Sequence, residues 1–97
     1  MTALDKLTSW YSAQCNGDWE HSYGISIDTL DNPGWLVKVD LTETDLETRI
    51  FIPVLRGESE TEHDWIHCNV ELGKFIGAGG SGNLSEIIEV FIAWSLE

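Results

Sequence analysis

Two alternating runs joined by a turn limit the fold of this chain more than any other feature. Residues 23–30 and 35–41 both alternate apolar with polar side chains, which gives each strand one apolar face. Between them stands Asp31-Asn32-Pro33-Gly34, in which proline presets φ and glycine supplies a positive φ for a tight turn. The sequence therefore predicts an antiparallel β-hairpin over residues 23–41.

Two more strands and two helices are predicted around this hairpin. Residues 46–55 and 65–72 alternate again, and Pro53 ends the first of these strands or places it at a sheet edge, because proline donates no ladder hydrogen bond. Apolar residues at three- and four-residue spacing predict helices over residues 4–14 and 84–94. We expect Thr2 or Asp5 to cap the first helix, and Asn83 to cap the second.

The order of these elements predicts an α+β fold in one domain, residues 1–97. It consists of an N-terminal helix, a four-stranded antiparallel meander sheet and a C-terminal helix, with both helices on one face of the sheet. Residues 74–82 end in a glycine-rich run and are interpreted as a connector that lets the last helix fold back onto the sheet.

The charge balance constrains the partners of the chain. It holds 17 acidic and 5 basic residues, a formal net charge of −12. Such a charge repels nucleic acid and anionic membranes and attracts a basic protein, for example a toxin that cuts nucleic acid. No apolar run reaches the ~18–20 residues of a membrane span, and no signal peptide precedes the first helix, so we expect a soluble cytoplasmic protein. The two cysteines lack metal or redox spacing and are expected to be reduced thiols.

Two motifs that suggest ligands are weak in this context. The run Gly77-Ala78-Gly79-Gly80-Ser81-Gly82 fits the spacing of a dinucleotide-binding loop, but only 15 residues follow it, too few for the acidic residue such a site needs. His63 and His67 lie four residues apart, which on a strand separates them by about 13 Å, too far to share one metal ion. No cofactor or metal is therefore expected.

An enzyme remains an alternative because of one short segment. Cys15 is followed by Asp18, Glu20 and His21, which are the residue types of a thiol- or carboxylate-based catalytic site. The end of the first helix lies just before Cys15, however, and the negative end of a helix raises a thiol pKa rather than lowering it. We expect no catalysis, and a structural role for Cys15.

A partner-binding surface is predicted on the sheet face away from the helices. An antiparallel sheet can leave one face in water, with polar side chains outward. Aromatic residues among charged groups on that face are typical of an interface, although packing of Phe51 and Trp65 against the loop of residues 56–64 is an equal alternative. The predicted contact residues on this face are Asp28, Asp40, Phe51, Trp65 and His67. A second group at the junction of helix and strand comprises Asp18, Trp19, Glu20 and His21.

Several separated motifs occur in one order along the chain: Trp10-Tyr11, Gly17-Asp18-Trp19-Glu20-His21, Asp31-Asn32-Pro33-Gly34-Trp35, Cys68-Asn69-Val70 and Gly77-Ala78-Gly79-Gly80. Together they resemble the immunity protein 53 family of bacterial polymorphic toxin systems. Ser81 stands where we would expect proline, which bears on the stiffness of the connector.

This resemblance implies an α+β immunity protein that protects its own cell by binding a toxin domain, and not an enzyme. Our hypothesis is stoichiometric occlusion, in which acidic side chains meet the basic substrate groove of the toxin. The alternatives are the small enzyme described above and an interaction subunit without a toxin, such as a homodimer paired through an edge strand.

Overall fold

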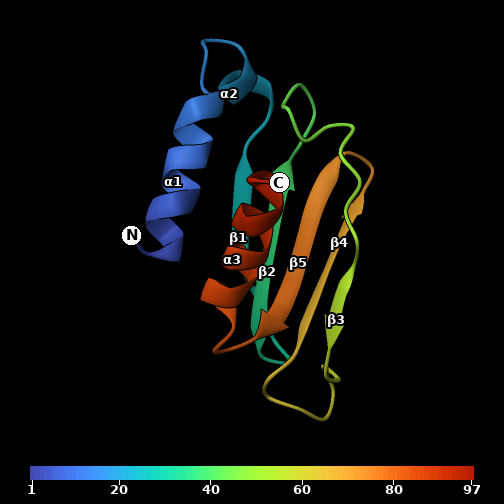
Figure 1. Ribbon diagram of the computed structural model, residues 1–97. Helices are drawn as coiled ribbons and strands as arrows, with labels where there is room; N and C mark the ends of the chain where they lie inside the picture. The colour runs from blue at the N-terminus through green and yellow to red at the C-terminus, as the bar shows by residue number, and fades with distance from the viewer.

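The computed structural model describes residues 1–97 and shows an α+β fold, in which helices lie on one side of an antiparallel five-stranded sheet (Figure 1). The strands are hydrogen-bonded in the order β1-β2-β5-β4-β3. The long helix α3 lies over the middle of the sheet, and α1 packs against α3 beside β1 (Figure 1). In chain order the elements are α1 (Ala3–Gln14), α2 (Trp19–Ser22), β1 (Ile25–Leu30), β2 (Gly34–Asp40), β3 (Val54–Arg56), β4 (Ile66–Glu71), β5 (Lys74–Gly80) and α3 (Leu84–Ser95).

The predicted first hairpin, the predicted strand over residues 65–72 and the two predicted helices are confirmed. The first hairpin pairs β1 with β2 so that Ile27 lies opposite Val37, and its turn contains a cis Asn32-Pro33 peptide bond. Helix α1 begins at a capping box, in which the Thr2 hydroxyl accepts a hydrogen bond from the backbone N–H of Asp5 at 3.0 Å. None of the helices has the length and apolar composition needed to cross a membrane.

The predicted connector over residues 74–82 is wrong, because residues 74–80 form β5 at the centre of the sheet. This strand pairs with β2 on one side and β4 on the other, which makes five strands instead of the four predicted. Two of its glycines, Gly77 and Gly79, are required by the close approach of α3: a Cβ added at Gly77 would lie 2.5 Å from Cγ2 of Ile87, and one added at Gly79 would lie 3.0 Å from its Cδ1. A two-residue turn joins β4 to β5 with positive φ at both Leu72 and Gly73.

The predicted strand over residues 46–55 is also wrong, except for its last residues in β3. Residues 46–53 pack around the end of α3 instead of joining the sheet. The Arg49 guanidinium donates to the carbonyl oxygens of Trp94 and Ser95, each at 3.1 Å, and the Trp94 indole donates to Ile50 O at 2.9 Å. Phe51 packs its ring edge-to-face against Trp94, with centroids 5.2 Å apart. The cationic side chain and the helix carbonyls are electrostatically matched at this helix end.

Asn83 begins α3, but the predicted cap through its side chain is wrong. Its amide donates to Asp64 at 2.8 Å and to Glu86 at 3.2 Å, and accepts no bond from the first turn. Arg56 at the end of β3 forms ion pairs with the same two carboxylates. This polar cluster joins the 57–64 loop, β3 and the start of α3 at one end of the sheet.

Candidate partner-binding surface

The sheet face opposite the helices, called the open face below, displays a row of five residues, one from each strand. The register places Asp28 on β1 beside Leu36 on β2, and Leu36 beside Ala78 on β5. The row continues to His67 on β4 and ends at Leu55 on β3. Asp28 and Leu55 are exposed, and the three residues between them are half-buried. The row is therefore apolar near its centre and polar at one end.

A second row lies next to the first. It consists of Ser26, Lys38, Ile76 and Asn69, again one residue per strand from β1 to β4. Leu36, Ile76 and Ala78 thus form an apolar centre surrounded by polar side chains, the arrangement of many protein interfaces. Neither Leu36 nor Ile76 was among the predicted contact residues. Ile76 was missed because it belongs to the strand that was interpreted as a connector, and Leu36 is an apolar residue on the same face of β2 as Lys38 and Asp40.

Of the two aromatic residues predicted as anchors of this surface, Trp65 lies on this face but is covered by the 57–64 loop, and Phe51 lies elsewhere. Trp65 is only 3% exposed, and its ring packs edge-to-face against His67 with centroids 5.3 Å apart. The 57–64 loop covers this pair, since Nε2 of His67 lies 3.2 Å from Gly57 O. Phe51 lies on the helix side, against Phe75 and Trp94, so its predicted place on the open face is wrong.

The four residues of the helix-to-strand junction belong to α2 and its first cap position. Trp19 is 3% exposed, and its indole donates to Thr42 O at 2.9 Å. The Glu20 carboxylate accepts the backbone N–H groups of Asn16 at 3.0 Å and Gly17 at 2.9 Å. Hydrogen bonds from its own backbone N–H and then from these two lower the pKa of Glu20. Trp19 and Glu20 therefore hold the junction together.

Asp18 and His21 of the same junction are exposed. Asp40 is half-buried at the end of β2, where it accepts the Gly24 N–H at 2.9 Å and pairs with Lys74. Of the three predicted residues that the structure brings together on the open face, Asp28, Asp40 and His67, only Asp28 has its side chain free of any hydrogen bond or ion pair.

Seven of the 17 acidic residues lie in two loops at the two ends of the sheet and not on the open face. Residues 41–48 follow β2 at one end, and residues 57–64 precede β4 at the other (Figure 1). Neither loop contains a lysine or an arginine. Their acidic side chains are all exposed: Glu43, Asp45, Glu47, Glu58, Glu60, Glu62 and Asp64.

The residues considered for catalysis do not form a hydrogen-bonded site. Cys15 is exposed, and its thiol donates to Tyr11 O at 3.4 Å. No histidine or carboxylate bonds to that thiol, and the Glu20 carboxylate is occupied by backbone groups. Burial raises the pKa of the Cys68 thiol to about 12. No group of three or more His, Cys, Asp or Glu side chains is arranged to hold a metal ion.

A family model described as Immunity protein 53 matches residues 4–96, nearly the whole chain. No curated protein and no solved structure shows significant similarity to the chain.

Proposed function

Because the chain belongs to the immunity protein 53 family, we propose that it binds a cognate toxin domain and blocks it by occupying its surface one-to-one. The observation that carries this proposal is the family match, which extends from residue 4 to residue 96. The family suggests an inhibitor that acts without catalysis. Binding in the cytoplasm is part of the proposal, and the two free cysteines are consistent with it.

A basic partner is favoured by how the few basic residues are used. Lys6, Arg56 and Lys74 form ion pairs within the chain, and Arg49 is bonded to the end of α3. The ion pairs involve four of the 17 acidic residues, which leaves 13 without one. This uncompensated charge would speed capture of a cationic protein, and nucleic-acid-cutting toxins are a class with such a surface.

We place the contact on the open face, because it is the face that no helix covers. Its apolar centre around Leu36 and Ile76 would exclude water, and Asp28, Lys38 and Asn69 around that centre would give polar contacts. The acidic loops at both ends of the sheet would then lie beside the partner and steer its approach. Trp19, Phe51 and Trp65 are left out of this surface because their side chains pack inside the protein.

Co-expression of the chain with the toxin domain encoded beside its gene tests this proposal. We expect the two proteins to co-purify, with an affinity that falls as salt is raised because charge steers and holds the complex. Asn69→Arg introduces a long cation at an exposed position of the open face and should raise Kd at least about tenfold, or ~1.4 kcal/mol.

The matched control is Ser85→Arg, which makes the same charge change at an exposed position of α3 on the other side of the sheet. Its Kd should stay within about twofold of the original. Equal weakening by both substitutions would show that charge alone matters and that the open face is the wrong surface. Failure of the two proteins to associate at all would contradict the proposed function itself.

A further inference from the structure

The outer strand β1 has a free edge of hydrogen-bonding groups. The Asp40 N–H donates to Gly24 O at 3.0 Å, so residue 24 faces β2 through its backbone. In an antiparallel ladder this role alternates along the strand, and the residues between point their N–H and C=O groups away from the partner strand. The outward residues of β1 are therefore Ile25, Ile27 and Thr29, and β1 is the first strand of the sheet, with no neighbour beyond it.

The two edges of the sheet differ in how well they are protected. Proteins blunt edge strands by shortness, proline, lysine or a bulge. At the other edge, β3 pairs through only three residues, follows Pro53, and by the same alternation presents Leu55 alone outward. Strand β1 pairs through six consecutive residues without a bulge and contains neither proline nor lysine. It is therefore an open template for a further strand.

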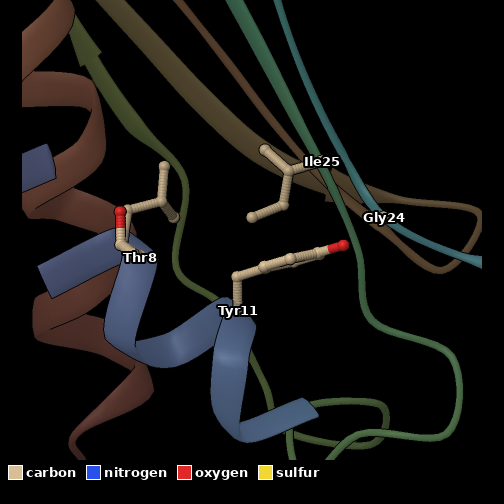
Figure 2. A pocket seen from close by; sticks show the side chains of 5 residues that line it. Thr8, Tyr11, Gly24 and Ile25 are labelled. Atoms are coloured by element: carbon tan, nitrogen blue, oxygen red, sulfur yellow. The ribbon is translucent and has the colours of Figure 1, made fainter. Parts of the chain in front are cut away.

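A partly empty apolar space lies on the helix side of this edge. Leu7, Thr8 and Tyr11 of α1 face Gly24 and Ile25 across a cavity of about 350 Å³, and the Tyr11 ring extends from α1 toward β1 (Figure 2). Tyr11, which lines it, is 36% exposed, and two apolar side chains of the same two elements are also incompletely covered, Leu4 of α1 at 60% and Ile27 of β1 at 38%. Helix α1 packs mainly on α3, so it leaves the helix-facing side of β1 without a full cover. A sixth strand beside β1 would fill this side of the layer.

The charges along the β1 edge indicate which kind of partner strand could bind there. Asp28 is exposed on the open face, and no basic residue stands on β1 or in the turn after it. A second copy of this chain would bring two charges of −12 together, with Asp28 of each copy on the same face of the joint sheet. An incoming strand with basic side chains on that face has the opposite, favourable charge. The edge thus fits a cationic partner better than it fits itself.

We propose that the toxin domain adds an extended segment to the free edge of β1, continuing the sheet by one strand. This inference rests on the proposed function and specifies its mode of binding. Residues of the segment that pair with Ile25, Ile27 and Thr29 point to the helix side, and they are apolar because they enter the space beside Leu7 and Tyr11. The residues between them point to the open face and are basic, since they pass Asp28.

Residue-resolved amide exchange of the chain, free and bound to the toxin domain encoded beside its gene, tests this mode. In the free protein the outward N–H groups of Ile25, Ile27 and Thr29 should exchange rapidly. In the complex their exchange should slow at least about tenfold, because they donate to the added strand. The matched control is the outward N–H of Leu55 at the opposite edge, whose exchange should not change.

A pair of variants at one exposed position isolates the backbone donor. Thr29→Pro removes an outward N–H without removing a bond to β2, and Thr29→Val changes the side chain but keeps that donor. We expect Thr29→Pro to raise Kd about tenfold or more, and Thr29→Val to change it by less than about threefold. Circular dichroism and urea unfolding of both variants identify a loss of fold.

The outcomes separate this inference from the function on which it rests. A tight complex in which the β1 amides exchange as fast as in the free protein would overturn strand addition and leave the immunity function standing. Protection of β1 in the chain alone, with a concentration-dependent dimer, would show that a second copy occupies the edge and would equally overturn it. The absence of any complex would overturn both.

Discussion

Substituting Gly77 by alanine tests whether the glycine-rich run is a strand beneath α3. The added Cβ would lie 2.5 Å from Ile87 Cγ2 and 3.0 Å from the Phe75 ring, whereas carbon atoms in contact normally stand about 3.5–4.0 Å apart. Ile87 and Phe75 are fully buried, so α3 or the sheet must move by about 1 Å. Such overpacking costs about 1–3 kcal/mol, and reduced entropy of the unfolded chain offsets about 0.4–1 kcal/mol of it.

Urea unfolding followed by tryptophan fluorescence measures this difference, and each kcal/mol should also lower Tm by about 4–8 °C. The control is Gly82→Ala, where no atom lies within 4 Å of the added carbon, so stability should be unchanged or slightly higher. Ile87→Ala removes the clashing methyl group. Its cost should be smaller in the Gly77→Ala background, by about 1 kcal/mol or more. Equal stability of the Gly77→Ala and Gly82→Ala variants would refute the close packing of α3 on β5.

Three further predictions concern stability and thiol chemistry. The exposed Cys15 should react with a disulfide reagent within minutes, whereas Cys68, which is buried and has its pKa raised to about 12, should react only as fast as the protein unfolds. Equal reaction rates of the two thiols would contradict the burial of Cys68. The ion pair with Arg56 lowers the pKa of Glu86. The pair therefore contributes stability above the unfolded carboxyl pKa of about 4, and this contribution is lost as pH falls through the lower pKa of the folded state. Arg56→Gln should therefore flatten the decline of the urea midpoint between about pH 5 and pH 2, and an unchanged decline would argue against this ion pair. Trp19→Phe loses an indole hydrogen bond to a backbone carbonyl and should lower the unfolding free energy by about 1 kcal/mol without changing the Kd for the toxin. Weaker binding with unchanged stability would show that Trp19 contacts the toxin.

The hairpin of β1 and β2 and the two long helices follow from local signals, which is why they can be predicted. Alternation, turn residues and helical spacing act over a few residues and do not depend on the rest of the chain. The same reasoning fails for β5, whose glycines carry no alternating side chains. Its hairpin turn is also unusual, because Leu72 adopts a positive φ that is uncommon for a leucine. Long-range pairing with β2 decides this strand.

On the candidate surface, too, local patterns predict some positions correctly and miss those that depend on distant segments. Asp28 and His67 lie on one face, as predicted, because side-chain direction in a strand follows from alternation alone. The positions of Phe51 and Trp65 depend on segments that fold back from elsewhere: Phe51 packs at the end of α3, and the 57–64 loop covers Trp65. Alternation in residues 46–53 imitates a strand, but the bonds of Arg49 to α3 hold this segment outside the sheet.

Titration of the toxin domain with the purified chain tests the immunity function most directly. Residual toxin activity should fall in proportion to added chain and reach zero at one chain per toxin, because the proposed mechanism is one-to-one occupation of the toxin without turnover. The endpoint should be the same for Cys15→Ala, since Cys15 lies at the end of α1, outside the proposed surface. Full toxin activity in the presence of excess chain would contradict the account. Inactivation of many toxin molecules by one chain would show that the protein is an enzyme.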